Sequence, residues 1–300
     1  MVDEPDAPVE GEKVAMTFSA STDATSRADA FTAFYVWADL VPSESTNPTT
    51  PELIFNGEKV EYTDGAWNYG EKKFWQPDSY YRFIGLDPKG QALKPTFNSS
   101  THTLSINGIT ASADADFCAA SSAREYRSGD ATSPVDMVFS HQLAKIQFIG
   151  RKHPNVAALT QINIVSAELK GLYSTMNWAM SVDNGGVQTI NTTNTGELSY
   201  TASAGAFSNI DNAHGANIFG ELLVVPQDMT RQAAITIKYN IDGKSEQTVS
   251  ANLNEASVRS WTSGKSITYN FTLNVAGVIE FSEPTIEPWT SKSGGNFLIQ

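Results

Sequence analysis

Hydrophobic and polar residues alternate with a period of two along much of the chain. The longest such run is ITYNFTLNV, residues 267–275, in which the apolar residues share one parity and the polar residues the other. Successive side chains of a β-strand point to opposite faces of its sheet, so this pattern predicts a strand with one buried face. No stretch longer than about ten residues keeps an apolar stripe of helical period with capping residues. The chain is therefore predicted to be all-β.

Asn-Gly and Asp-Gly pairs mark candidate turns between these strands, because they supply the positive φ angles that two-residue hairpin loops require. Alternating residues flank two of the pairs on both sides, which predicts hairpins there. Residues 28–39 are compatible with a helix by composition, but an aromatic-rich buried strand fits them equally, and we interpret them as a strand. The pairs are Asn56-Gly57, Asp64-Gly65, Asn107-Gly108, Asn184-Gly185 and Asp242-Gly243, of which the second and fifth have the alternating flanks.

The segment PVDMVFSHQLAKIQFI, residues 134–149, changes its alternation partway along. Apolar residues occupy one parity up to Leu143 and the other parity from Ala144. A bulge or bend between these residues would let one strand begin at a domain junction and end in a second sandwich. His141 lies in the apolar parity just before the change. We interpret it as a hydrogen-bonded structural residue near the junction, with a ligand or acid–base role as the alternative.

Length and charge narrow the class of protein. A chain of 300 residues is expected to form two domains, on a prior of roughly 150 residues per domain. Its net charge of -13, without a cluster of Lys or Arg, makes nucleic acid an unexpected partner. No apolar run approaches the roughly 20 residues that span a bilayer. The acidic segment DEPDAPVEGE, residues 3–12, suits either a flexible tether to a surface or an ordinary disordered terminus.

Motifs for catalysis, metals and cofactors are each incomplete. The sequence Gly-Lys-Ser at 264–266 resembles the end of a phosphate-binding loop, but Arg259 stands where the loop needs glycine. A calcium-like spacing begins at Ile210, which has no carboxylate. Cys118 has no histidine near it in the sequence and is interpreted as a small buried or surface residue. Glu283 and Glu287 imitate a glycosidase pair only by chance. We therefore expect no enzyme, no metal and no cofactor.

Seven aromatic residues crowd into residues 67–83. If they were exposed, they would form a platform on which sugar rings stack, as in a surface glycan-binding module. Alternatively they fill the interior of the first sandwich, which the shared parity of Tyr81 and Phe83 favours. The candidate platform residues are Trp67, Trp75, Tyr80 and Tyr81.

Four segments of the chain, in this order, resemble the fimbrillin-like surface proteins of Bacteroidetes, the subunits and accessory proteins of donor-strand pili. Each segment is weak by itself, but together they span nearly the whole chain. The resemblance implies two tandem transthyretin-like β-sandwich domains, with residues 1–133 in the first and 134–300 in the second. The polar, turn-rich residues 124–134 agree with that boundary. The segments are TSRADAF (25–31), FWQPDSYYRFIGLDP (74–88), VDMVFSHQLAKIQF (135–148), and SWTSGKSITYNFTLN followed by IEFSEPTIEPW (260–289).

The resemblance also implies a function, which is a structural or adhesive subunit of a fimbria assembled by strand donation. An arginine-specific protease would cut between Arg27 and Ala28 and release an N-terminal strand. The strand VAMTFSA, residues 14–20, alternates so that Val14, Met16 and Phe18 share one face. Its departure would open a groove in the first domain, which a strand of the next subunit would fill.

The donor strand is expected at the C-terminus, at about residues 284–300, where Trp289, Phe297, Leu298 and Ile299 are the candidate apolar residues. An edge strand on the protein's own second domain is the alternative for this tail. The expected partners are other pilus subunits, the protease, and a host or bacterial surface ligand. The resemblance further implies export as a lipoprotein, with a signal absent from this chain, to the extracellular face of the outer membrane.

Overall fold

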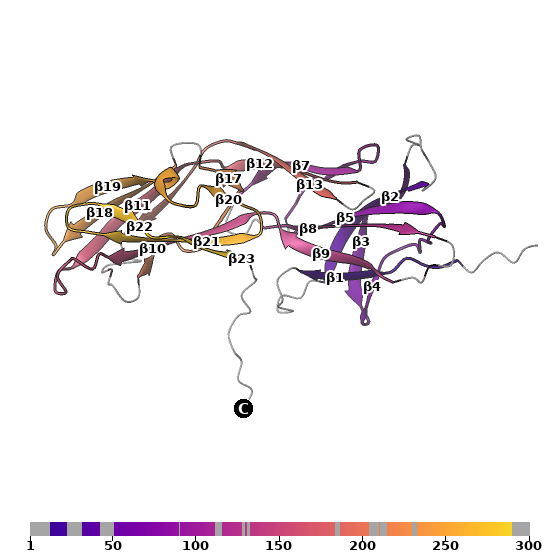
Figure 1. The fold of residues 1–300 in the computed structure, drawn as a ribbon, viewed down its shortest axis with the longest axis horizontal. Coiled ribbons are helices and arrows are strands. Elements are labelled where there is room, and N and C mark those ends of the chain that lie inside the picture. Colours follow the sequence, from indigo (N-terminus) through magenta and orange to yellow (C-terminus); the bar gives the residue numbers. More distant parts are fainter. Residues whose placement is uncertain are drawn as a thin grey trace, which may run out of the picture.

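The chain folds into an elongated molecule with two lobes (Figure 1). The structure, a computed structural model, describes residues 13–22, 32–42, 51–89, 91–111, 116–127, 130, 133–183, 187–203, 210, 215–229 and 233–289. Apart from the 3₁₀ helix η1 (Leu253–Glu255), the regular elements within these ranges are β-strands. The predicted all-β class is confirmed, and the two lobes are consistent with tandem sandwiches. None of the helical structure in this part of the chain is long and apolar enough to cross a membrane.

The first lobe is built on a seven-stranded sheet. An isolated antiparallel bridge joins Ala15, which precedes the first strand, to Phe74, which follows the last, and hydrogen bonds between their neighbours flank it. Because these residues adjoin opposite edges of the sheet, the sheet curls round and encloses a core. Its strands, in spatial order, are β1 (Phe18–Thr22), β9 (Val135–His141), β8 (Cys118–Tyr126), β5 (Ser79–Asp87), β2 (Ala33–Pro42), β3 (Glu52–Thr63) and β4 (Ala66–Asn68).

A four-stranded sheet packs on the outer face of this curled sheet. Trp37 of β2 and Ile84 of β5 form a second core with residues of the smaller sheet, among them Leu104 and Trp178. All four of these side chains are at most 6% exposed, so the curled sheet is buried on both faces here. The strands of the smaller sheet, in spatial order, are β13 (Gln188–Thr195), β12 (Thr175–Val182), β7 (Thr103–Thr110) and β6 (Thr96–Asn98).

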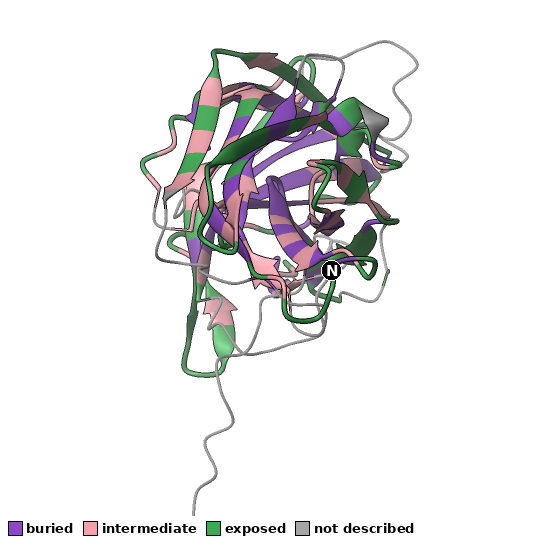
Figure 2. Cartoon of the chain, turned by 90° about the vertical axis from the view of Figure 1, so that its left-hand side faces the viewer, coloured by how far each residue is buried: buried purple, intermediate pink, exposed green. Residues whose placement is uncertain are grey.

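The second lobe is a sandwich of two sheets, whose buried apolar side chains face each other while the more exposed positions lie outside (Figure 2). One sheet contains β15 (Ala216–Asn217), β16 (Leu222–Val224), β10 (Ala144–Lys152), β21 (Lys265–Leu273), β22 (Ile279–Phe281) and β23 (Thr285–Pro288). The other contains β14 (Leu198–Ser203), β11 (Ile162–Leu172), β18 (Ala234–Ile241) and β19 (Gln247–Asn252), and a separate ribbon pairs β17 (Gln227–Asp228) with β20 (Ser260–Trp261).

The chain crosses between the lobes at three places in strand-to-strand connections, which lie between β9 and β10, between β11 and β12, and between β13 and β14. As a result, β9 pairs with β8 of the first lobe, and β12 pairs with β7. Residues 135–141, 175–182 and 188–195, which follow the predicted boundary of 133 and 134, therefore belong to sheets of the first lobe. The predicted boundary lies in the connection between β8 and β9, one strand before the first crossing, and the division into two domains at that point stays a prediction.

The change of parity in residues 134–149 corresponds to the first crossing. β9 ends at His141 and β10 begins at Ala144, and the bend between them was expected from the shift of the apolar pattern. Leu143 is fully buried in the core between the two first-lobe sheets. The Gln142 side chain accepts a hydrogen bond from Trp178 Nε1 at 3.0 Å. Both residues of the bend are thus held by the first lobe.

The Asx-Gly pairs divide into turns and bulges. Both residues of Asp64-Gly65 and of Asp242-Gly243 have positive φ and close the predicted hairpins β3–β4 and β18–β19. By contrast, Asn56-Gly57 and Asn107-Gly108 lie inside β3 and β7, where the pairing register shifts. A glycine with positive φ fits the first position of a β-bulge as well as it fits a turn. The pair at 184–185 lies outside the described residues.

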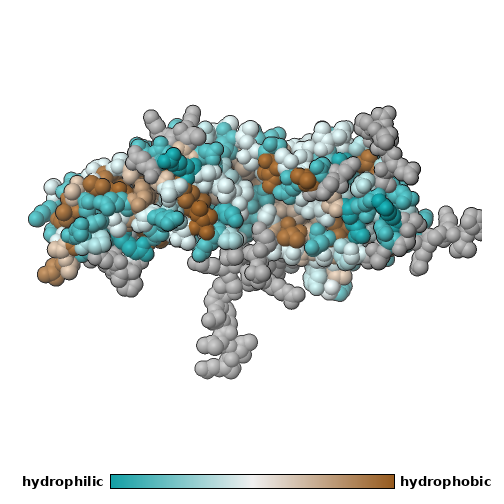
Figure 3. Space-filling model, viewed as in Figure 1, coloured by the Kyte–Doolittle hydropathy of each residue, from teal (hydrophilic) through white to brown (hydrophobic). Residues whose placement is uncertain are grey.

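Large apolar side chains are exposed only in small, separate patches on the face seen in Figure 3. Scattered exposure of this kind is normal for a protein surface and marks no binding site by itself. Among the residues that the structure describes, the exposed large apolar ones are Leu53, Tyr62, Phe74, Val138, Leu159, Val187, Val275, Val278 and Ile286.

Candidate functional site

The N-terminal segment 14–22 is inserted between two strand edges of the first lobe. On one side β1 pairs in parallel with β9, from Phe18 opposite Val135 to Thr22 opposite Phe139. On the other side, the backbone N–H of Met16 donates to the backbone oxygen of Lys73 at 2.8 Å, and the backbone N–H of Trp75 donates to the backbone oxygen of Val14 at 3.0 Å. The segment therefore closes the curled sheet, and without it both edges would lose backbone partners.

Apolar side chains of this segment fill the first core. Met16 is 2% exposed and Phe18 5% exposed, while Val14 packs partly buried against the same cluster. The ring of Phe18 makes edge-to-face contacts with four aromatic rings, at centroid separations of 5.6 to 6.1 Å. The burial agrees with the alternation of residues 14–18, whereas their release as a displaced strand stays a prediction. The four rings belong to Phe34, Phe55, Tyr69 and Phe83.

The C-terminal arm lies against its own protein as far as residue 289. β23 pairs antiparallel with β21, and all four of its residues are exposed. Trp289 follows it, donates its backbone N–H to Gly264 O at 2.7 Å, and is only 7% exposed. Its ring stacks on His141 with centroids 4.0 Å apart. Residues 285–288 thus form an edge strand of the second lobe with Trp289 as an aromatic anchor, and the role of the tail beyond them stays a prediction.

Several predicted site residues lie outside the described part of the chain. These are the candidate cleavage residues Arg27 and Ala28 and the tail residues Phe297, Leu298 and Ile299.

The aromatic residues of 67–83 are mostly inside the first lobe. Trp75 is 5% exposed and Tyr81 is fully buried. Trp67 is partly buried and packs on Phe34, with 5.3 Å between ring centroids. Of the predicted platform, only Tyr80 and Trp67 retain partial exposure. The set therefore cannot present a continuous stacking surface, and the interior alternative describes these rings better.

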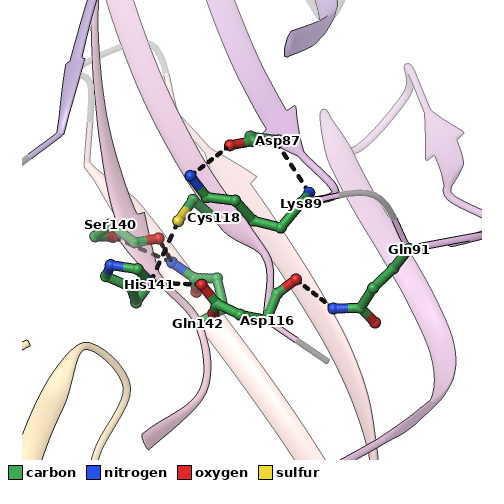
Figure 4. A network of polar contacts seen from close by, with 8 residues as sticks. All are labelled: Asp87, Lys89, Gln91, Asp116, Cys118, Ser140, His141 and Gln142. Carbon is green, nitrogen blue, oxygen red and sulfur yellow. Dashed lines mark hydrogen bonds and ion pairs between the residues drawn. The ribbon is translucent and has the colours of Figure 1, made fainter. Parts of the chain in front are cut away.

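A polar cluster lies at the junction of the lobes, where β8 begins and β9 ends (Figure 4). His141 Nδ1 is 2.7 Å from Asp116 Oδ2 and 3.5 Å from Cys118 Sγ. Cys118 and His141 are 1% and 5% exposed, and the Asp116 side chain is 15% exposed. The predicted structural role of His141, hydrogen-bonded near the junction, agrees with this placement.

Cys118 has no histidine near it in the sequence, yet pairing of β8 with β9 places it directly opposite His141. Asp116 lies two residues before Cys118 and so has the same parity. The arrangement does not form a nucleophilic triad, because the thiol and the carboxylate approach the same ring nitrogen rather than opposite ones. Only the register of the two strands reveals this cluster.

A second buried polar group lies between the sheets of the first lobe. Arg82 of β5 donates two hydrogen bonds to the carboxylate of Asp39 on β2. His102, in the turn before β7, places Nδ1 2.8 Å from Asp39 Oδ2, although its ring is not oriented to form a hydrogen bond there. Burial lowers the pKa of His102 below its ordinary 6.5, with the nearby carboxylate opposing that shift. The group ties the β6–β7 turn to the curled sheet.

Solved structures share this fold at low sequence identity. A fimbrial protein of Bacteroides vulgatus superposes with a TM-score of 0.62 at 16% identity, covering 92% of this chain and 99% of its own. Putative cell adhesion proteins of Bacteroides eggerthii and Bacteroides uniformis give TM-scores of 0.52 and 0.51, at 16% and 17% identity. These cover 95% and 93% of this chain and 98% and 99% of their own. No curated protein sequence matches the chain.

The sequence itself matches a family over almost its whole length. The fimbrillin-like family pattern covers residues 20–289, from β1 in the first lobe to the Trp289 anchor of the C-terminal arm. The match therefore includes both lobes, the crossings between them and the junction cluster. This chain belongs to the fimbrillin-like family.

Proposed function

We propose that this protein is a structural or adhesive subunit of a bacterial surface fimbria that assembles by strand donation after its N-terminal strand is cut away. The family is one of fimbrial and cell adhesion proteins, which suggests a place at the cell surface. The observation that carries the finer proposal is the position of segment 14–22, hydrogen-bonded on both sides and closing the curled sheet.

Loss of that segment would create the site that a donor strand fills. The edge of β9 and the segment 73–75 would lose their backbone partners, and the rings around Phe18 would be uncovered. Burying a side chain the size of Met or Phe is worth about 1.5–3 kcal/mol. An incoming strand with apolar residues at alternate positions would recover both the ladder and the burial.

The donor is proposed to come from the C-terminal tail, at about residues 284–300. Residues 285–288 already pair with β21 and Trp289 anchors the chain after them, which favours a donor drawn from the residues that follow. Phe297, Leu298 and Ile299 are the proposed inserting residues. The partners under this proposal are further subunits, an arginine-specific protease acting between Arg27 and Ala28, and a surface ligand. Export as an outer-membrane lipoprotein belongs to the same proposal.

Cleavage by an arginine-specific protease tests the proposal. The purified chain is treated with the protease, the cut is located by mass spectrometry, and assembly is followed by size-exclusion chromatography and electron microscopy. We expect a cut after Arg27 followed by oligomers. The matched control is Arg27→Lys, which keeps the charge but removes the cleavage site and should remain monomeric. A protein that stays monomeric after verified cleavage at Arg27 rules out the polymerising role.

Deletion of residues 294–300 tests the donor separately. Loss of assembly with an unchanged melting temperature supports donation by the tail. A large fall in melting temperature would instead show that these residues stabilise the protein's own second lobe.

A further inference from the structure

We propose that Asp116, Cys118 and His141 form a binding site for one zinc-like divalent transition-metal ion at the junction of the lobes. The proposal is independent of strand donation, because it concerns only the cluster where β8 begins and β9 ends.

Strand geometry brings the three ligand atoms together. Cys118 and His141 are direct partners across the β8–β9 pair, and Asp116 has the parity of Cys118 two residues earlier. Directly opposed residues of paired strands point to the same side of the sheet, and Asp116, in the segment that leads into β8, lies close enough to reach them. The thiol sulfur, the carboxylate oxygen and the imidazole nitrogen all lie within 4.8 Å of one another.

Two features of the cluster favour a cation among these three side chains. Asp116 Oδ1 is buried and has no hydrogen-bond partner among the described residues, which is costly for a carboxylate oxygen. In addition, the carboxylate and the sulfur both approach His141 Nδ1, a nitrogen that carries at most one proton. A metal ion bound at Nδ1 would replace that proton and take both groups as ligands.

The chemistry of the three groups suits zinc better than a harder cation. Zinc accepts thiolate, imidazole and carboxylate ligands, whereas calcium and magnesium require mostly oxygen. On binding, the Cys118 thiol releases its proton to solvent, and the neutral His141 ring carries its proton on Nε2. One thiolate and one carboxylate then balance the charge of the ion, which favours binding in a buried place. The fourth position is left to water.

Neighbouring groups hold the ligands in place. Gln91 Nε2 donates a hydrogen bond to the backbone oxygen of Asp116 and fixes the segment that carries this ligand (Figure 4). The ring of His141 is stacked on Trp289, which restrains its orientation. The partial exposure of Asp116 gives the cluster a route to solvent. A bound ion would therefore connect the start of β8 to the end of β9, next to the Trp289 ring that stacks on its histidine ligand.

Cobalt(II) titration of the reduced, chelator-treated full-length chain tests this site. We expect a thiolate-to-cobalt absorption band and tetrahedral visible bands, both abolished by added zinc. Cys118→Ala should remove the thiolate band. Asp116→Asn, which keeps the size of the side chain, and His141→Gln should each weaken binding by at least about tenfold. Zinc should also raise the melting temperature of the wild-type chain but not of Cys118→Ala.

The matched control is His153→Gln, because His153 pairs with Glu280 away from the junction and should not affect cobalt binding. Three results would overturn the proposal. They are absence of a thiolate band when the folded wild-type chain is in a large excess of cobalt, unchanged affinity in both Asp116→Asn and His141→Gln, or an equal loss in His153→Gln. Circular dichroism of each variant establishes that it is folded before the titration is read.

Discussion

Replacing Phe18 with alanine tests how firmly the N-terminal strand belongs to the first core. The side chain is 5% exposed and is enclosed by four aromatic rings in edge-to-face contact. Truncation of Phe18 to alanine removes this ring from a core that the strands of the curled sheet surround. The remaining cavity cannot collapse without moving the strands that carry those rings.

The expected loss follows from these contacts. Burial of a phenylalanine and the cavity left by its removal together cost about 3–5 kcal/mol. Edge-to-face pairs add about 0.5–1.5 kcal/mol each beyond their buried area, although such contributions are not additive. We therefore expect Phe18→Ala to lower the free energy of unfolding by about 4–5 kcal/mol. A typical domain is stable by only about 5–15 kcal/mol, so the first lobe would become marginal.

Urea denaturation followed by tryptophan fluorescence and circular dichroism measures this loss. Ser19→Ala is the matched control, because Ser19 adjoins Phe18 and its hydroxyl makes an exposed hydrogen bond to Asp136 at 3.0 Å. That change should cost less than about 1 kcal/mol. A loss below about 1.5 kcal/mol for Phe18→Ala would refute the reasoning, since it would mean that the core closes without this strand.

Two further predictions concern the buried polar groups and the arm. Because the pKa of His102 is lowered in the folded state, the unfolded chain binds more protons, and stability should fall as the pH drops below about 6.5. His102→Asn, which tolerates the positive φ of 45° at this position, should lose that part of the pH dependence in urea titrations at several pH values; an unchanged slope would contradict the assignment. Trp289→Ala should lower the free energy of unfolding by about 3–5 kcal/mol, because the ring is buried between His141 and the first-lobe core. Melting curves measure this, and a shift as small as that of the exposed Ile286→Ala would contradict the anchoring role.

Local patterns in the sequence predicted the strands better than their partners. The alternation from Ile267 to Leu273 marks buried positions of β21, and the pattern ends there, since Val275 is 50% exposed. The parity change at Leu143 marked the crossing from β9 to β10. In both cases the information lies within one strand, where burial of alternate residues leaves a direct signature.

Pairing between distant strands left no comparable signature. Nothing local in residues 175–182 indicates that they pair with residues 103–110 rather than with a strand of the second lobe. The Cys118–His141 contact depends on the register of β8 and β9, and a slip of one residue would turn these side chains to opposite faces. The sequence therefore shows that Cys118 and His141 are present but does not show that they are in contact.

The exchange of strands between the lobes also bears on the order in which this protein folds. The core beneath β2 and β5 includes Trp178, from the middle of the chain, and Trp289, from near its end. When the first half of the chain has been synthesised, its strands lack the residues that complete this core. Such long-range contacts are formed late and slowly. Both lobes should therefore acquire their final packing together, once almost the entire chain is available.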